Sequence, residues 1–245
     1  MGCLFVTGTD TGVGKTIFSL ALLAALRARG VDAVAFKPVE TGCSSVPGSS
    51  DELVGDDCRA LGRVTGQSPD QVAGRLYSLP AAPMVAAAER GETVDVDSLA
   101  ADVHALADEH ELVLVEGAGG LLVPLAPSLT WIDFLARAPM PVVCVVASRL
   151  GCINHALLTM SALESAGAEL AGYVMNQLAD DDSPGGNGQA IADFGHLAGN
   201  PPCLGTLTAL APEEISNSGQ LARLGEAGLD IDALLAAAHS PVQGG

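Results

Sequence analysis

Lysine is the scarcest charged residue in this chain of 245 residues, which contains only Lys15 and Lys37. Basic residues number 11 against 29 acidic ones, so the formal net charge is −18 at pH 7. Such a charge repels nucleic-acid backbones and anionic lipid surfaces, which excludes nonspecific binding to either. An acidic protein can bind an anionic ligand only through a few locally placed cations, so both lysines become candidate site residues.

Aromatic residues are also rare, at 3% of the chain, which leaves a core to be built from Ala, Val and Leu. The six cysteines form no Cys-x-x-Cys pair and have no histidine at zinc-ligand spacing, so we expect reduced thiols. The sequence has no apolar run near the roughly 20 residues of a membrane-spanning helix, and no signal-peptide pattern. These absences predict a soluble, cytoplasmic protein that does not bind membranes.

Hydrophobic residues make up 49% of the chain, which is ample for one large core. Short apolar runs alternate with Ala- and Leu-rich helical segments, the order typical of βαβ units. The expected strands, apolar on both faces as in a covered parallel sheet, are 3–7, 34–36, 112–115, 142–147 and 170–175. The expected helices are 17–29, 57–64, 84–90, 96–109, 132–138 and 153–166.

The sequence therefore predicts a single α/β domain over residues 1–245, with a mainly parallel sheet and helices on both of its faces. Residues 180–188 are polar and glycine-rich, and we expect a mobile surface loop there, since the residues that follow contain too little core to stand alone. A frayed tail is expected over about 240–245.

A glycine-rich segment from Gly8 to Thr16 stands between the first expected strand and the first expected helix. Its glycines allow backbone N–H groups to turn inward around a phosphate, and the helix N-terminus adds a favourable dipole. Lys15 can reach terminal phosphate oxygens and Thr16 can ligate a magnesium ion. The loop is one residue longer than the ordinary motif, because Gly8 precedes Gly14 by six positions. A turn that binds nothing is the alternative, against which the placement of Gly-Lys-Thr argues.

Further charged residues follow the expected strands, at the edge where open parallel sheets bind ligands. Lys37 follows the strand 34–36, and the alternative to a functional role is an ordinary solvated charge. Glu116 follows the strand 112–115 and can hold Mg²⁺ directly or through water; an acid before a plain turn is the alternative. Asp56 and Asp57 open a helix, where capping alone would explain them.

Two more candidate sites lie at later strand ends. The segment Gly151 to His155 leads into a helix whose exposed N–H groups could hold a substrate carboxylate, with Asn154 assisting. We interpret His155 itself as a surface helix residue. Asn176, after the last strand, is placed for an amide contact with a nucleobase edge, and a strand-end turn residue is the alternative.

Taken together, residues 8–16, 37–39, 115–120 and 150–155 closely resemble the motifs of the dethiobiotin synthetases, in order, over about residues 4–176. The resemblance implies a P-loop fold, a homodimer, and ring closure of 7,8-diaminononanoate that depends on ATP and Mg²⁺. In that reaction CO₂ adds to one amine, the carbamate is phosphorylated by ATP, and the second amine closes the ring to dethiobiotin with release of ADP and phosphate.

The resemblance also implies roles for individual residues. The metal ligands would be Thr16, Asp57 and Glu116, with Asp51 and Asp56 as alternatives to Asp57. The catalytic contacts to phosphate and carbamate would come from Thr11, Lys15 and Lys37. The nucleotide would be bound by Gly12, Val13, Gly14, Lys15, Thr16 and Asn176. The substrate would be bound by Lys37, Thr41 and Gly119 and, across the dimer interface, by backbone groups of Cys152, Ile153 and Asn154.

Three positions depart from the family pattern. Gly12 stands where some members have Glu, and Arg149 where some have Lys. Residues 204–208 lack an Ile-Pro pair that frames the adenine in some relatives, which leaves base selectivity open.

Two other functions share such a loop. A partner-regulated switch ATPase would carry a second lysine where Asp10 stands. An amidoligase acting on cobalamin precursors would need a glutaminase domain with a catalytic cysteine, for which this chain has no room.

Overall fold

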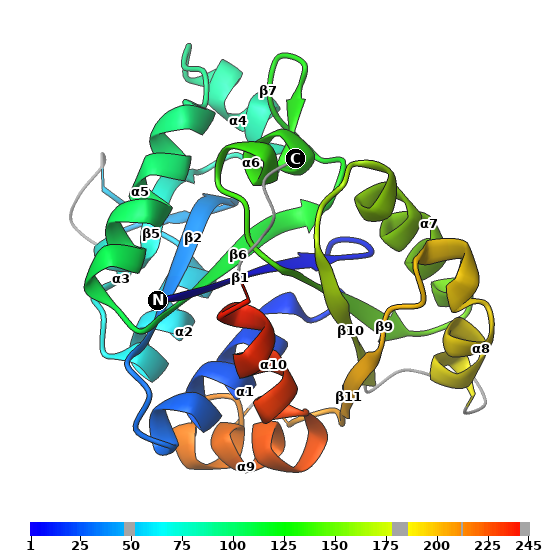
Figure 1. Ribbon diagram of the computed structural model, residues 1–245. Coiled ribbons are helices and arrows are strands. Elements are labelled where there is room, and N and C mark those ends of the chain that lie inside the picture. Colours follow the sequence, from blue (N-terminus) through cyan, green and yellow to red (C-terminus); the bar gives the residue numbers. More distant parts are fainter. Residues whose placement is uncertain (47–51, 178–185, 212, 241–245) are drawn as a thin grey trace.

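A seven-stranded sheet runs through the centre of the molecule (Figure 1) in the computed structural model, which describes residues 1–46, 52–177, 186–211 and 213–240. Every neighbouring pair of strands in it is parallel. The order across the sheet is β11 (Cys203–Leu207), β10 (Leu170–Gln177), β9 (Val142–Ser148), β1 (Gly2–Gly8), β6 (Leu112–Gly120), β2 (Ala33–Thr41) and β5 (Ala73–Tyr77). The predicted α/β class with a parallel sheet is confirmed.

Helices cover both faces of this sheet, because successive side chains of each apolar strand point to opposite sides. In β1, Leu4 and Val6 join one core cluster, whereas Phe5 joins the other. The first face is covered by α1 (Lys15–Ala28), α2 (Asp56–Thr65), α9 (Ser218–Gly228) and α10 (Ile231–Ala238). The opposite face is covered by α4 (Pro83–Glu89), α5 (Val96–Glu109), α6 (Trp131–Arg137) and α7 (Cys152–Ser165).

Smaller elements complete the described part of the chain. Helix α8 (Asn187–Asp193) and the 3-10 turn η1 (Gly195–Ala198) pack beside α7, while α3 (Pro69–Val72) precedes β5. Two antiparallel pairs lie outside the main sheet: β3 (Ser44–Ser45) with β4 (Leu53–Val54), and β7 (Pro124–Ala126) with β8 (Leu129–Thr130). Over the described residues, no helix has both the length and the apolar character needed to cross a membrane.

The six expected helices and five expected strands are all present, but β2, β6 and β10 continue two or more residues past their predicted ends, so Asn176 lies within β10 and not after it. β2 pairs with β6 as far as Phe36 and then with β5 from Lys37 onward. β6 continues alongside β1, where Val6 is paired with Glu116. Lys37 and Glu116 therefore lie within strands, and the prediction that they follow strand ends was wrong. The expected strand 34–36 was too short because β5, the late partner of β2, was not recognised.

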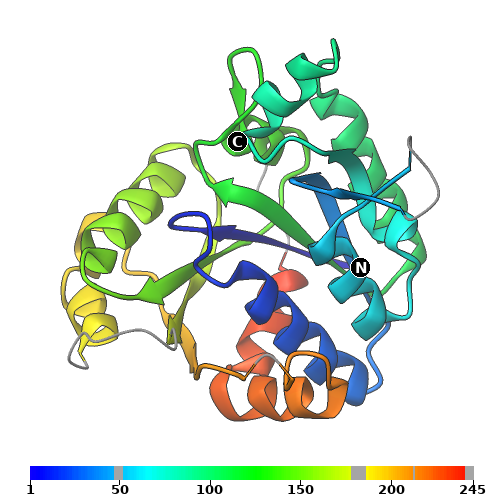
Figure 2. The ribbon, with the colours of Figure 1, turned by 180° about the vertical axis from the view of Figure 1, so that it is seen from behind.

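The C-terminal part of the chain was the least well predicted. Residues 178–185 lie outside the described residues, but α8 begins at Asn187, so the predicted loop does not extend to residue 188. Of the tail predicted over about 240–245, residues 241–245 also lie outside the described residues. β11 joins the main sheet beside β10, and α9 packs against α1, as Figure 2 shows for the blue and orange helices at the bottom of the view.

Candidate active site

The glycine-rich loop joins the central strand β1 to α1, so it lies at the carboxyl edge of the sheet. Gly14 is the N-cap residue of α1 and has a φ of 91°, a left-handed conformation that glycine adopts without strain. A Cβ atom at this position would overlap Nδ2 of Asn176. That same Nδ2 donates a hydrogen bond of 2.9 Å to the carbonyl oxygen of Val13. A residue of β10, which lies two strands from β1 in the sheet, therefore holds the loop through one amide, which only a glycine at 14 admits.

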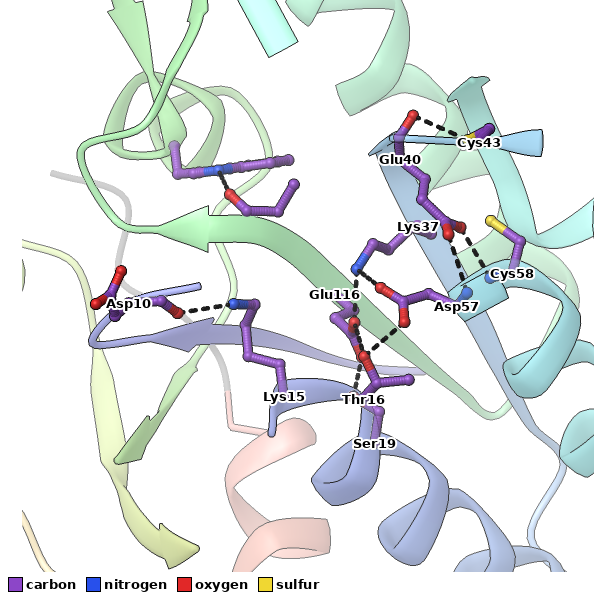
Figure 3. A network of polar contacts seen from close by, with 12 residues as sticks. Asp10, Lys15, Thr16, Ser19, Lys37, Glu40, Cys43, Asp57, Cys58 and Glu116 are labelled. Atoms are coloured by element: carbon purple, nitrogen blue, oxygen red, sulfur yellow. Dashed lines mark hydrogen bonds and ion pairs between the residues drawn. The ribbon is translucent and has the colours of Figure 1, made fainter. Parts of the chain in front are cut away.

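A compact cluster of hydroxyl, ammonium and carboxylate groups lies beside this loop (Figure 3). Thr16 Oγ1 is 2.9 Å from Asp57 Oδ1 and 3.0 Å from Glu116 Oε1. Lys37 Nζ donates to Asp57 Oδ2 at 2.7 Å and to Glu116 Oε1 at 2.6 Å. Ser19 Oγ donates to Glu116 Oε2 at 2.6 Å. Elements α1, β2, α2 and β6 thus bring these five side chains to one point.

The two lysines of the chain are in different electrostatic states. Burial alone would lower the pKa of Lys37, but the adjacent Glu116 and Asp57 outweigh it and raise that pKa, so the ammonium stays charged. Burial, followed by the Lys37 ammonium, lowers the pKa of Lys15 to about 8. Lys15 Nζ donates only to the carbonyl oxygen of Asp10, at 3.2 Å, among the hydrogen bonds of the described residues. An anion placed beside Lys15 would favour its charged form.

The structure distinguishes between the aspartates that the sequence left open. Lys37 lowers the pKa of Asp57 against the opposing effect of burial, and Asp57 contacts Thr16 as well. Asp56 also borders the cavity above the cluster, but its side chain is 89% exposed and pairs with Arg59 at 3.1 Å. Asp51 lies outside the described residues. Of Asp56 and Asp57, only Asp57 belongs to the cluster.

A cavity of about 490 Å³ opens above this cluster and contains both lysines. Its lining also includes the predicted residues Thr11, Gly12, Gly14, Thr16, Thr41, Asp57 and Gly119. A neighbouring cavity of about 430 Å³ shares Thr11, Thr41 and Gly119, and it extends along Pro80–Pro83 to Val123. Most of the residues predicted for nucleotide and substrate therefore border one continuous region.

The segment predicted to bind a substrate carboxylate lies apart from this region within the chain. Cys152, Ile153 and Asn154 form the first turn of α7 and line neither cavity. Cys152 is buried in the core, whereas Asn154 is exposed. Arg149, just before this turn, forms an ion pair of 3.2 Å with Asp10 of the phosphate loop. Within one chain, the structure does not bring residues 152–154 to either cavity.

Sequence reasoning missed two residues that contact the cluster. Ser19 lies three residues after Thr16 and so on the same face of α1, a helical spacing that could have identified it. Glu40 accepts backbone hydrogen bonds from the start of α2, and it lies in the part of β2 that the sequence did not predict. Its role depends on a contact between distant segments, for which the sequence has no local signal.

The oxygen atoms of the cluster suit magnesium. Mg²⁺ prefers hard oxygen ligands and is usually held by one or two carboxylates together with substrate phosphates. Thr16, Asp57 and Glu116 provide one hydroxyl and two carboxylates at one point. In the part of the chain that the structure describes, no group of three or more His, Cys, Asp and Glu side chains could hold a metal ion. Thr16, Asp57 and Glu116 include only two such side chains. They could hold Mg²⁺ with a phosphate completing its coordination.

Replacement of Asn176 by alanine should weaken nucleotide binding by about fivefold, the effect of losing one net hydrogen bond of about 1 kcal/mol. Because Asn176 holds the loop carbonyl of Val13, we expect ATP and GTP to be affected alike in calorimetric titrations. Gln189→Ala is the control, since it removes an exposed amide that donates to Asp193 on α8. A loss confined to ATP would contradict this expectation and assign Asn176 to the base.

Known proteins resemble this chain in sequence and in fold. A family described as AAA domain matches residues 3–225. The ATP-dependent dethiobiotin synthetase BioD of Xanthomonas euvesicatoria pv. vesicatoria is 44% identical over 176 residues, which are 71% of this chain and 77% of that protein. The ATP-dependent dethiobiotin synthetase BioD 1 of Escherichia coli O157:H7 is 39% identical over the same shares.

Solved structures add a likeness in fold alone. The cell division ATPase MinD of Pyrococcus furiosus aligns with a TM-score of 0.57 and 19% identity, over 96% of this chain and 100% of that one. The fold of this chain is therefore of the P-loop NTPase kind, as the sequence predicted.

Proposed function

This chain belongs to the ATP-dependent dethiobiotin synthetase family, and on that premise we propose that it converts 7,8-diaminononanoate, CO₂ and ATP into dethiobiotin, ADP and phosphate with Mg²⁺ as cofactor. The observation that carries this proposal is one cavity lined by Lys15, Lys37, Thr16 and Asp57, with the buried Glu116 bonded to Thr16 and Lys37 beneath it. In a protein of net charge −18, these are the only two lysines. Their meeting in one cavity suits a reaction that gathers negative charge there.

The phosphate loop would bind the nucleotide. Backbone N–H groups of Gly12, Val13 and Gly14 and the start of α1 would hold the phosphates, and Lys15 would neutralise the terminal one. Thr16, with Asp57 and Glu116, would hold the magnesium ion, which neutralises charge on the phosphoryl group during transfer.

The base would lie beside Asn176. A small cavity of about 120 Å³, lined by Ile17, Asn176 and residues 208–210, supports this position. The absence of the Ile-Pro pair from residues 204–208 leaves room for bases other than adenine.

The chemistry needs no nucleophile from the protein. One amine of the substrate attacks CO₂ and loses a proton, which forms a carbamate. A carbamate oxygen attacks the γ-phosphorus as the bond to ADP breaks, and the second amine then attacks the carbonyl carbon and expels phosphate. Lys37, Thr11 and Lys15 would stabilise the charge that develops on the transferred group, while Thr41 and Gly119 would border the carbamate and diamine.

We propose that the active enzyme is a homodimer in which the Cys152–Asn154 turn receives the distal carboxylate of a substrate bound to the partner subunit. The separation of this turn from the cavities of its own chain supports that arrangement. Two leucines near it, Leu150 and Leu158, are 97% and 62% exposed and would be covered by a partner.

The proposal also includes a cytoplasmic location and a single domain. All six cysteines are free, which supports a reducing cytoplasm as the site of action. The joining of β11 to the main sheet supports one domain over residues 1–245.

Phosphate release is the direct test of this function. We expect release from ATP to require 7,8-diaminononanoate and bicarbonate together and to yield one dethiobiotin per phosphate, because transfer needs the carbamate as acceptor. Mass spectrometry of the product checks the ratio. Release that ignores both compounds and rises with an added partner protein would contradict the proposal and favour a switch ATPase.

A further inference from the structure

Glu40 is a buried acid that borders the cavity of the two lysines but is outside the set of residues assigned to nucleotide, metal or substrate. It lies on β2 three residues after Lys37, and it is 7% exposed. Its Oε1 accepts a hydrogen bond of 2.9 Å from the backbone N–H of Asp57, and its Oε2 accepts one of 2.9 Å from that of Cys58 (Figure 3). One carboxylate therefore joins the strand that carries Lys37 to the helix that carries Asp57.

These two bonds replace an ordinary helix cap. The N-cap position of α2 is Gly55, which has no side chain to accept from the first N–H groups of the helix. The carboxylate of Glu40 takes those donors instead, and its charge is favourable at the positive end of the helix dipole. A Cβ atom on Gly55 would overlap this carboxylate. The glycine thus makes room for an acid that arrives from a distant strand.

We propose that Glu40 is a positioning residue that sets the place of the Asp57 carboxylate for the metal. A side chain at position 55 could cap α2 equally well, but it would not tie the helix to β2. The bond from Glu40 fixes the backbone of Asp57 relative to the strand of Lys37, whose Nζ lies 2.7 Å from Asp57 Oδ2. This inference rests on the proposed function for the identity of the metal site.

Glu40→Gln should weaken divalent-metal binding about tenfold, within the range typical when a partner of a metal ligand is changed. The amide has one acceptor oxygen, so one of the two N–H groups loses its bond and faces an NH₂ group instead. Asp57 then loses its fixed position, while the phosphate loop is untouched. We therefore expect the Mg²⁺ concentration for half-maximal turnover to rise and the affinity for metal-free ADP to stay unchanged.

Gly55→Ala should disturb the contact between Glu40 and the start of α2 without changing Glu40 itself. The backbone angles of Gly55, φ −88° and ψ 143°, suit alanine, so the Glu40 carboxylate is the obstacle that remains. We expect the same loss of metal affinity. The double variant Glu40→Ala, Gly55→Ala lacks the Glu40 carboxylate, so the alanine at position 55 no longer overlaps a neighbour. We expect this double variant to bind metal no more weakly than the single variant Glu40→Ala.

Asp95→Ala is the matched control for a helix cap. Asp95 caps α5 through a bond of 2.9 Å from Ser98 N, and neither residue lines the cavity. This variant should lower the melting temperature and leave metal affinity unchanged. A purely structural role of Glu40 would produce the same pattern as this control.

The test is a titration of each folded protein with Mn²⁺ in the presence of ADP, followed by electron paramagnetic resonance well below the melting temperature. Weaker binding in both Glu40→Gln and Gly55→Ala supports the proposal; if Glu40→Gln fails to fold, Gly55→Ala alone decides. Binding as tight as wild type in the folded variants overturns it. Because the titration involves no turnover, it stands apart from the proposed function, which fails only if the wild-type enzyme releases no diamine-dependent phosphate.

Discussion

Lys37→Ala should lower turnover by about 100- to 1,000-fold, the loss typical when one group aimed at a transition-state charge is removed. Lys37 is 3% exposed, and its pKa is raised by Glu116 and Asp57, so it brings a fixed positive charge to the cavity. That charge would act on the phosphoryl group during its transfer to the carbamate. Diamine-dependent phosphate release at saturating substrate measures the effect.

The same substitution should also destabilise the protein. The Lys37 ammonium lies between two carboxylates, one of which, Glu116, is 1% exposed. Leaving a buried charge without its partner costs about 3–5 kcal/mol. Turnover must therefore be measured on protein shown to be folded by circular dichroism.

Arg59→Ala is the control for the loss of a positive charge near α2. Arg59 pairs with Asp56 at the surface, where both side chains are at least half exposed, so its removal should change neither stability nor turnover appreciably. Folded Lys37→Ala enzyme with near-wild-type turnover would show that Lys37 has no part in the chemistry.

Glu116→Gln should raise the Mg²⁺ concentration for half-maximal turnover by about tenfold or more, as changes in a metal site usually do. Glu116 lies beside three donors, Thr16, Ser19 and Lys37, all within 3.0 Å. A glutamine offers one oxygen and turns its NH₂ group toward some of those donors, so it disrupts the cluster as well as removing a negative charge. Metal titrations of the steady-state rate check this expectation.

Ser19→Ala tests how much of that effect comes from disruption of the hydrogen bonds of the cluster, because it leaves the charge of Glu116 unchanged. It removes the donor to Oε2 but leaves Oε1, the oxygen beside Thr16 and Lys37, in place. We expect a smaller change in metal dependence than for Glu116→Gln. An unchanged metal titration in Glu116→Gln would contradict the assignment of Glu116 as a ligand.

The phosphate loop and the apolar strands could be predicted because each depends on residues that are close together in the sequence. The Gly8–Thr16 loop was identified because its glycines, lysine and threonine are adjacent and stand between a strand and a helix. The apolar strands were found because a sheet covered on both faces leaves no polar positions in its core. These features need only a few neighbouring residues to be recognised.

Features that depend on contacts between distant segments were missed. β5 is short and mostly half-buried, and its pairing partner β2 lies more than thirty residues away. The bonds from Glu40 to the first turn of α2 likewise join segments that no periodicity connects. The choice of Asp57 over Asp56 came from the family resemblance, and the directions of the two side chains now support it physically.

The surroundings of two cysteines, Cys58 and Cys144, explain why their thiols stay protonated. Cys58 is fully buried, and burial together with Glu40 raises its pKa, so the thiol stays protonated beside Asp57. Burial raises the pKa of Cys144 to about 12. These cysteines act as core residues, and neither is available as a nucleophile.

The central claim is that Lys15 and Lys37 act together on one triphosphate held by the loop and its metal. A crystal structure with a non-hydrolysable ATP analogue, Mg²⁺ and 7,8-diaminononanoate tests it most directly. We expect both ammonium groups within hydrogen-bonding distance of the γ-phosphate or the carbamate position, and the metal on Thr16, Asp57 and Glu116. A bound triphosphate that Lys37 does not approach, with the metal on other ligands, would contradict the account.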